Sequence, residues 1–154
     1  MKELTEYRQR LLERLVESAK SFRAACLDAQ EPFAPLEPGG WNVHQTAAHT
    51  RDVNELVYGS RARRTVEEEN PEFANFDGDA YMAEQYKPEE PLGAMLDGFV
   101  TDVESLAAFL RQLSPEAWSR QSRHATMGGG FTLQIWVERS LAHIEEHIES
   151  LARG

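Results

Sequence analysis

Apolar residues recur at helical spacing in four long stretches of the chain. These stretches cover about residues 3–27, 43–66, 92–113 and 132–151. Their apolar side chains are mostly three, four or seven positions apart, which places them on one face of a helix and leaves charged residues on the other. The pattern therefore predicts four long amphipathic helices. The third stretch is the most regular, with Leu92, Met95, Leu96, Phe99, Val103, Leu106, Leu110 and Leu113.

The segments between these stretches contain residues that end helices or form turns. The run "EPFAPLEPGGW" holds three prolines and two glycines and cannot continue a helix, and Asn42 after it is placed to cap the second helix. The connection over residues 67–90 is longer than the median loop of about 4–6 residues. Within it, "DGDAYMAEQY" predicts a short helix with Asp79 as its cap. A further short turn is predicted at "SPEAW", and a flexible turn at the glycines 128–130.

Four long helices without a convincing strand predict an all-α fold, a four-helix bundle with a long crossover between the second and third helices. The crossover also permits neighbouring helices to run parallel instead of strictly alternating. The chain of 154 residues suits a single domain, spanning 1–154, with a sizeable core.

Charge and composition narrow the classes of partner. The formal net charge is −10 at pH 7 and the Lys and Arg residues are scattered, so phosphates would be repelled and nucleic acid is not an expected partner. The sequence has no run of about 18 apolar residues, the length that a membrane helix needs. Charged residues also interrupt the N-terminal region, which would be apolar in a signal peptide. We expect a cytoplasmic protein. The one cysteine, Cys26, excludes an internal disulfide and a multi-cysteine zinc site, and its helical position predicts a buried thiol.

The last helix contains two histidines four residues apart. His143 and His147, in "LAHIEEHIESL", project from one face about one turn apart, so they could share one cation. Trp136 and Ser140 lie on the same stripe, which indicates a face turned partly inward. Two ligands make a weak site, and metals in helix bundles are held by side chains from facing helices. A third ligand therefore has to come from another helix.

The other histidines of the chain are His44, His49 and His124. His44 and His49 are about 140° apart around a straight helix, so both cannot point at one ion. His49 follows two alanines, which are small enough to let another helix approach closely. His44 lies at helical spacing from Arg51 and Glu55 and is expected on an outer face. His49 is therefore the better candidate for the third ligand.

Three neutral imidazole ligands, His49, His143 and His147, would leave at least one coordination position of an ion open, which favours catalysis over a closed structural role. Such a set suits Zn²⁺, Ni²⁺ or Fe²⁺ and does not choose among them. Two alternatives without catalysis stay open. The ion could only pin the second helix to the fourth in a metal-binding or interaction protein, or the histidines could be ordinary residues of a helical interaction module without metal.

Two motifs resemble those of the DinB-like, or damage-inducible, metal-binding four-helix bundles. The first, "WNVHQTAAHTRDV" at 41–53, is similar to the family's second helix, with a tryptophan, a histidine eight residues later and an aspartate soon after. The second, "TLQIWVERSLAHIEEHIESL" at 132–151, resembles the family's last helix with its H-x-x-x-H. The resemblance covers essentially the whole chain. It departs from many relatives at Glu146, where they carry a further histidine.

The resemblance implies that His49, His143 and His147 are the metal ligands and that His44 and His124 are not. Through the thiol-dependent transferases of the family, it also implies an enzyme with a small-molecule substrate. In such an enzyme a divalent metal activates a low-molecular-weight thiol cosubstrate for attack on a small electrophile. A metal-dependent hydrolase is the nearest alternative, because the same kind of site lowers the pKa of water. Family members are often dimers, so the resemblance implies a homodimer.

Two carboxylates near the histidines are candidate catalytic groups. Asp52 lies about one turn from His49, and Glu146 about one turn from His143. Each could orient a ligand ring or accept a proton, or could instead be a solvated charge. Four aromatic residues could wall a substrate pocket or pack beneath the crossover: Phe76, Tyr81, Tyr86 and Trp136.

Overall fold

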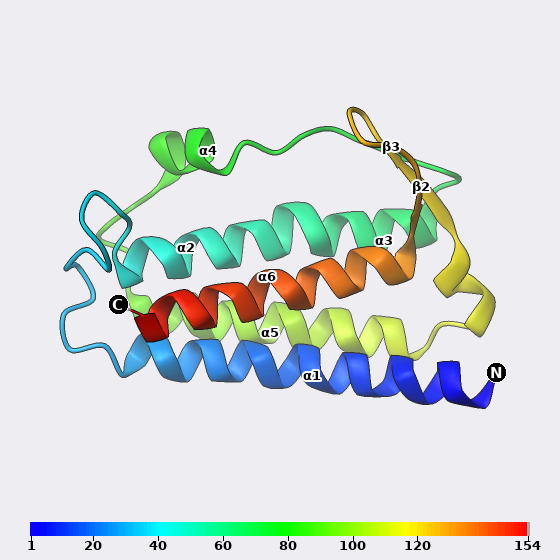
Figure 1. Cartoon of the computed structure of the whole chain (residues 1–154), viewed down its shortest axis with the longest axis horizontal. Helices are drawn as coiled ribbons and strands as arrows, with labels where there is room; N and C mark the ends of the chain where they lie inside the picture. The colour runs from blue at the N-terminus through cyan, green and yellow to red at the C-terminus, as the bar shows by residue number, and fades with distance from the viewer. Residues whose placement is uncertain (154) are drawn as a thin grey trace.

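The four predicted helices form a bundle in the computed structural model, which describes residues 1–153 (Figure 1). The second long helix is α2 followed by α3, joined without a break through a π-helical turn, η1, at Asn54–Gly59. The predicted four-helix bundle is confirmed. Its long helices are α1 (Lys2–Leu27), α2 (Val43–Val53), α3 (Ser60–Glu67), α5 (Leu92–Arg111) and α6 (Leu133–Arg153).

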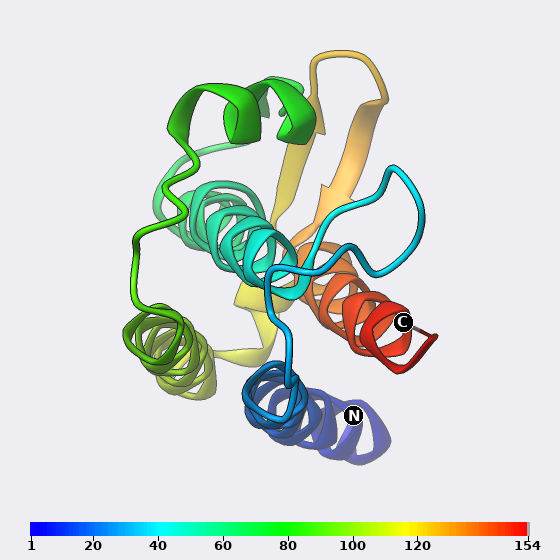
Figure 2. The same ribbon diagram turned by 90° about the vertical axis from the view of Figure 1, so that its left-hand side faces the viewer.

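The long crossover makes neighbouring helices run parallel. After α3 the chain returns over the top of the bundle through the short helix α4 (Gly78–Gln85), so that α5 begins at the same end as α2 (Figures 1 and 2). Helices α2 and α5 therefore run in one direction, and α1 and α6 run together in the other. Helix α1 packs chiefly against α5 and α6, and α2 contacts the same two helices from the opposite side. The parallel neighbours that the long connection permits are thus present.

The apolar faces of the four helices meet in one core. Phe22 of α1 and Phe99 of α5 are fully buried, with ring centroids 5.6 Å apart in an edge-to-face arrangement. Ile144 of α6, next to His143 in the chain, is 1% exposed. Burial of such a side chain stabilises the fold by about 1.5–3 kcal/mol, so the packing of Ile144 helps to fix the orientation of α6 and with it the position of His143. No helix in the described part of the chain is both long and apolar enough to cross a membrane.

The helical fold also carries a small sheet, although no strand was expected. Strands β1 (Glu72–Phe73), β2 (Gln121–His124) and β3 (Gly128–Thr132) lie in the order β1-β2-β3, with β1 parallel and β3 antiparallel to β2. The prediction of a flexible turn at 128–130 is wrong, because these glycines begin β3. Gly128 and Gly130 have φ angles of 90° and 85°, which residues with a Cβ rarely adopt.

Polar side chains anchor β2 to the bundle. Ser122 Oγ accepts a hydrogen bond from Trp136 Nε1 of α6 at 2.7 Å and donates one to a carbonyl of β3. His124 Nδ1 accepts from the backbone N–H groups of Thr126 and Met127, at 3.2 Å each. A ring nitrogen that accepts two N–H groups is unprotonated, so the proton of the neutral ring is on Nε2. The strand is therefore fixed by satisfied buried polar groups, without an alternating apolar pattern.

Of the two helix caps predicted from the sequence, one is confirmed and one is wrong. The prediction that Asn42 caps α2 is confirmed: its side chain accepts from the Gln45 backbone N–H at 2.7 Å, and the Gln45 side chain accepts from the Asn42 backbone N–H at 2.9 Å. The cap of α4 is Asp77, which accepts from a backbone N–H three residues on, so the prediction of Asp79 is wrong. Asp79 lies instead in the first turn. The turn predicted at "SPEAW" is a 3₁₀-helix, η2 (Pro115–Ser119).

We expect Cys26 to resist thiol reagents in the folded protein. Its side chain is fully buried, and burial raises the pKa of the thiol to about 12, whereas the thiolate is the reactive form. At about pH 8, a chromogenic disulfide reagent should leave the folded chain unmodified over the time in which the urea-unfolded chain takes up one equivalent. Rapid stoichiometric labelling of the folded chain would contradict this burial.

Candidate metal centre

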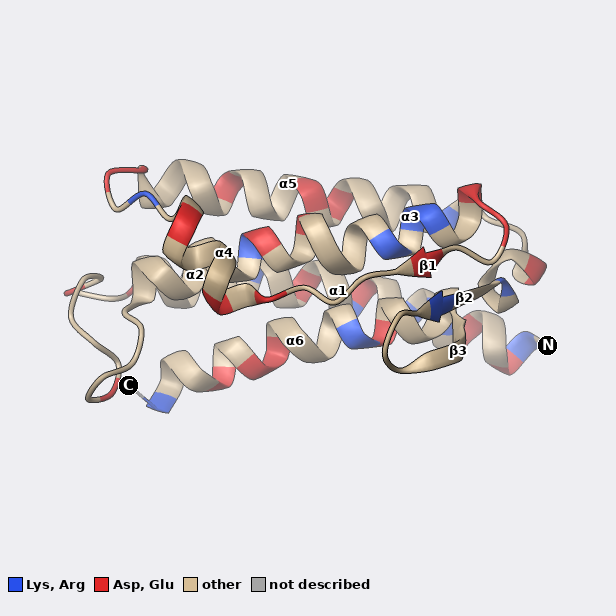
Figure 3. Cartoon of the chain, turned by 90° about the horizontal axis from the view of Figure 1, so that it is seen from above, with Lys and Arg blue, Asp and Glu red and all other residues tan. Residues whose placement is uncertain are grey.

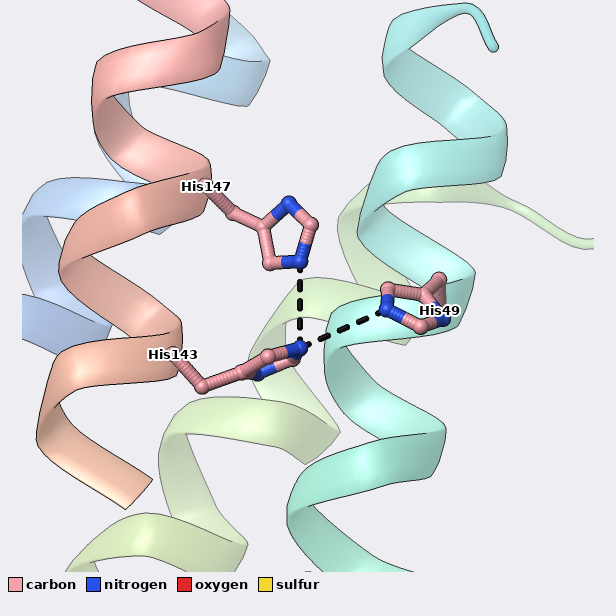
Figure 4. Close-up of side chains that lie close together, drawn as sticks. All are labelled: His49, His143 and His147. Carbon is pink, nitrogen blue, oxygen red and sulfur yellow. Dashed lines mark hydrogen bonds between the residues drawn. The ribbon is translucent and has the colours of Figure 1, made fainter. Parts of the chain in front are cut away.

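The structure brings together the three histidines selected from the sequence. His49 projects from α2, and His143 and His147 project from α6 toward it (Figure 4). The Nε2 atoms of His49 and His143 are 3.3 Å apart, and those of His143 and His147 are 3.0 Å apart. One ligand atom of each side chain lies within 4.8 Å of the others. Three nitrogens from two facing helices thus converge on one point.

Burial keeps these three rings neutral at pH 7. It lowers the pKa of His49 to about 4, with a further contribution from His147, while the Asp79 carboxylate opposes the change. It also lowers the pKa of His143 to about 3, and the other two rings add to that effect. The pKa of His147 is lowered by burial, and Glu146 opposes this. Each ring therefore has one nitrogen with a free lone pair, which is the form that binds metal.

The separations fit a shared metal ion. Two nitrogens bound at about 2.0–2.1 Å to one tetrahedral ion lie about 3.3 Å apart, and the two Nε2 separations here are 3.3 and 3.0 Å. Neutral rings cannot satisfy one another fully at this distance, because each carries only one N–H donor. The donor set, three borderline-soft nitrogens, suits Zn²⁺, Ni²⁺ and Fe²⁺.

Aromatic rings and a glycine surround the cluster. The ring centroid of Trp41 is 4.8 Å from that of His49, and the centroid of Tyr58 is 5.7 Å from that of His143. Gly78, at the start of α4, lies directly against His49: a Cβ built on Gly78 would be 3.1 Å from His49 Cε1. The crossover therefore covers the cluster on the side of His49.

A pocket of about 480 Å³ opens beside His147. It lies between the loop that precedes α2 and the end of α6, and its wall includes Trp41, Thr46, Asp79 and Arg153. The pocket leads from solvent to one member of the histidine cluster, so a small molecule could reach the converging nitrogens from this side.

His44 is buried, and its expected outer position is wrong. It is 1% exposed, with Nδ1 2.7 Å from the Tyr86 hydroxyl and Nε2 2.7 Å from the Glu90 carbonyl oxygen. Because a carbonyl can only accept, Nε2 carries the proton and Nδ1 accepts from Tyr86. The segment between α4 and α5 folds over this face of α2, and His44 holds it there. Both ring nitrogens are thus engaged away from the histidine cluster.

The two candidate carboxylates have different surroundings. Asp52 lies 3.0 Å from Arg51 Nε, and Arg51 also pairs with Glu90. Burial raises the pKa of Asp52, which Arg51 opposes. Glu146 is exposed on α6, close enough to His147 to act on its pKa. Among residues 1–153, neither carboxylate has a hydrogen bond to the three histidines.

Of the aromatic residues proposed as pocket walls, one packs in the interior and three lie in the crossover. Trp136 is fully buried, stacked on Phe131 with ring centroids 4.8 Å apart. Tyr86 binds His44, and the Phe76 and Tyr81 rings pack on each other. The inward stripe predicted for α6 is confirmed, since Trp136 and Ser140 are 0% and 1% exposed.

The site residues that sequence reasoning missed come from outside regular helical spacing. Trp41 precedes α2, so its contact with His49 does not follow from a helical repeat. Tyr58 reaches His143 from the π-helical turn η1, whose extra residue per turn changes which side chains share a face. The carboxylate whose charge opposes the lowered pKa of His49 is Asp79, which had been assigned to a cap. Of Trp41, Tyr58 and Asp79, only Trp41 could have been linked to the site from the sequence, because it opens the first motif.

Comparison with known proteins agrees with the fold. A solved structure described as "YfiT from Bacillus subtilis is a probable metal-dependent hydrolase with an unusual four-helix bundle topology" superposes with a TM-score of 0.80 at 23% identity, covering 96% of this chain and 87% of that chain. At this identity the match shows the shared fold. No curated protein matches the sequence. The sequence model of the DinB superfamily matches residues 3–151. The chain therefore belongs to the DinB superfamily.

Proposed function

We propose that this protein is a divalent-metal-dependent enzyme whose metal ligands are His49, His143 and His147. The convergence of three neutral Nε2 atoms at separations of 3.0 and 3.3 Å carries the proposal. Three such ligands are the number that catalytic zinc sites use, with a further position left for water or substrate. The pocket beside His147 supplies an approach to that position.

The proposed reaction is the transfer of a low-molecular-weight thiol to a small electrophile. A divalent cation held by neutral ligands lowers the pKa of a thiol and so supplies a nucleophile at neutral pH. In the transfer, a sulfur–carbon bond forms and the bond from that carbon to the leaving group breaks. The leaving group departs with the electron pair, and the thiol proton passes to a base. The protein's own thiol cannot take this role, since Cys26 is fully buried in the core.

The chain supplies the groups that would hold and shield the reactants. Trp41, beside His49, offers an apolar wall at the pocket, and Gly78 leaves room for the His49 ring under α4. Asp79 lies in the wall of the pocket beside His147, and its charge acts on the pKa of His49, which makes it the carboxylate best placed to accept a proton. Glu146 is a second proton acceptor in this proposal, and Asp52, paired with Arg51, would act only by orienting α2.

A metal-dependent hydrolase is the second candidate. The description of the Bacillus subtilis structure as a probable metal-dependent hydrolase favours it, and the same cation would lower the pKa of water. In that case the bond between the acyl or phosphoryl centre and its leaving group breaks by attack of water. The pocket walls suit attack by a thiol and attack by water equally, and an activity assay with two substrates separates the two reactions.

The test uses metal-loaded protein and two substrates. Zn²⁺- and Ni²⁺-loaded protein is incubated with free cysteine and a fluorogenic chlorobimane, and separately with a chromogenic acetate ester in the absence of thiol. Thiol transfer predicts saturable turnover of the bimane at a rate at least about 100-fold above the uncatalysed reaction. His143→Gln should abolish the turnover, because it removes the central nitrogen of the cluster.

The control variant is His124→Gln, which changes a buried histidine outside the cluster; the glutamine oxygen can still accept from the backbone N–H groups of Thr126 and Met127, so the variant should keep the activity. Ester hydrolysis without bimane turnover would overturn thiol transfer in favour of the hydrolase. A protein that binds one metal ion per chain but shows neither activity, and whose Co²⁺ absorption does not respond to cysteine or azide, would have a structural ion only.

A further inference from the structure

Two arginines lie around one buried indole near the histidine cluster. Arg61 of α3 places its Cζ atom 4.8 Å from the Trp136 ring centroid, and Arg139 of α6 places its Cζ 5.9 Å from the same centroid. Arg61 is also 5.7 Å from the Phe73 ring, and Arg139 is 5.3 Å from the Phe131 ring. Aromatic faces attract guanidinium groups and hold them in place. The two cations are thus positioned by three rings on separate elements.

Neither guanidinium has a carboxylate partner. Arg61 donates from Nη2 to the Ala74 carbonyl oxygen at 2.9 Å, and within residues 1–153 neither Arg61 nor Arg139 forms an ion pair. Two acidic residues at this end of the bundle pair with other arginines: Glu68 with Arg64 and Glu72 with Arg123. A guanidinium has five N–H donors, so most of the donors of both arginines have no acceptor in the described part of the chain.

The pair makes a positive region on a strongly negative chain. Arg61 is only 8% exposed, although the formal net charge of the chain is −10. Burial lowers the pKa of Arg61, which the nearby Arg139 cation reinforces and Tyr58 opposes. Burial also lowers the pKa of His124, and both arginines contribute. A buried cation next to a second cation is costly unless an anion is present, so the arrangement suits an anionic ligand better than empty solvent.

The positive region is adjacent to the histidine cluster. Arg139 precedes His143 by four residues on α6, which is about one turn or about 6 Å along the helix. Tyr58, whose ring is 5.7 Å from the His143 ring, precedes Arg61 by three residues on the facing helix. In Figure 3, basic segments of α3 and α6 lie on either side of the segment between β1 and α4. The arginines therefore lie about one helical turn from the cluster.

We propose that Arg61 and Arg139 bind an oxyanion group, a carboxylate or phosphate, of the small electrophilic substrate. The planar fork of a guanidinium matches both groups with two parallel hydrogen bonds. The inference rests on the proposed function for what happens at the other end of the substrate, and it adds the substrate's charge class. The bound anion would hold the remainder of a short substrate near His143.

The experiment measures anion binding in the metal-free protein, so that it does not depend on turnover. The indole N–H resonance of Trp136 is followed in ¹⁵N-labelled protein during titration with benzoate and, separately, with inorganic phosphate, against sodium chloride at equal ionic strength. This N–H donates to Ser122 Oγ and belongs to the ring over which both guanidinium groups lie. We expect a saturable shift with a dissociation constant of about 1–10 mM for at least one anion. The stronger of the two titrations distinguishes carboxylate from phosphate.

Three variants separate binding from folding. Arg139→Gln, at an exposed position, should weaken binding by at least about tenfold, and Arg139→Lys should recover part of it. Arg63→Gln removes the same charge from α3 but from a side chain that lies over Phe109, and it should leave binding unchanged. A wild-type titration with no more response than chloride, or an Arg139→Gln variant that binds as tightly as the wild type, would overturn the subsite. Parallel samples of each variant are loaded with Zn²⁺ and their metal content is measured, so loss of the metal site would be seen separately.

Discussion

The His49→Ala, His143→Ala, His147→Ala triple variant is expected to lose all stoichiometric metal. Wild-type protein purified without a histidine tag or chelator should carry about one divalent ion per chain by mass spectrometry. The structural reason is that the three Nε2 atoms converge at separations, 3.0 and 3.3 Å between neighbours, that fit ligands of one ion. A single His143→Ala change removes the central nitrogen and should lower affinity by at least about 100-fold.

Stability should follow metal content. A ligand at about 1,000 times its dissociation constant stabilises the state that binds it by about 4 kcal/mol. For a chain of 154 residues this corresponds to a rise in Tm of about 10 °C when Zn²⁺ is added to metal-free protein. The triple variant should show no such rise, whereas His124→Gln should behave as the wild type. A wild type that takes up neither Zn²⁺ nor Ni²⁺, or a triple variant that still binds one ion, would refute the metal centre.

The Gly59→Ala variant is expected to lose about 2–3 kcal/mol of unfolding free energy. A Cβ on Gly59 would lie 2.6 Å from the Asn54 carbonyl oxygen, a backbone atom that cannot move without changing the helix. The φ of Gly59 is −64°, so the constraint is the close approach within the π-helical turn and not a left-handed backbone. Relief of the clash would require η1 to give up its wider turn. That change would rotate Tyr58 and Arg61 with respect to His143.

The matched control is Gly98→Ala on α5. Nothing lies within 4 Å of a Cβ at Gly98, so this variant should gain up to about 1 kcal/mol from helix propensity. Urea unfolding followed by circular dichroism measures both variants with one protocol. A lower unfolding free energy for Gly59→Ala together with a higher one for Gly98→Ala would confirm that the π-helical turn needs a glycine. Equal stability of Gly59→Ala and the wild type would contradict it.

The long helices and the histidine cluster followed from local periodicity. Residues three and four apart share a face in any regular helix, so His143 and His147 had to be neighbours wherever α6 was placed. His49 was selected because the small residues Ala47 and Ala48 before it allow close packing, and both alanines are indeed buried. These inferences need only the geometry of one helix and the rule that bundle helices face each other.

Most features that the sequence did not predict depend on contacts between distant parts of the chain. His44 was expected on an outer face because its helical neighbours are charged, but a segment more than 40 residues away folds over it and bonds both ring nitrogens. Strands β1 and β2 pair residues about 50 positions apart and contain Ser122 and His124 in place of apolar inward residues. The π-helical turn was missed because Asn54–Gly59 contains only one buried apolar side chain, Val57, which is too few to reveal a change in the helical repeat.

The order of helices in the bundle determines when the site can form during synthesis. Helix α1 packs chiefly on α5 and α6, both of which leave the ribosome after it, so the first half of the chain has no partner for its apolar face. His49 meets His143, 94 residues later, only after the C-terminal helix has docked. Such separations slow folding, because chain entropy is lost before the contacts form. A nascent chain therefore brings its three metal ligands together only once α6 has docked, whereas α1 and α5 can already pack on each other.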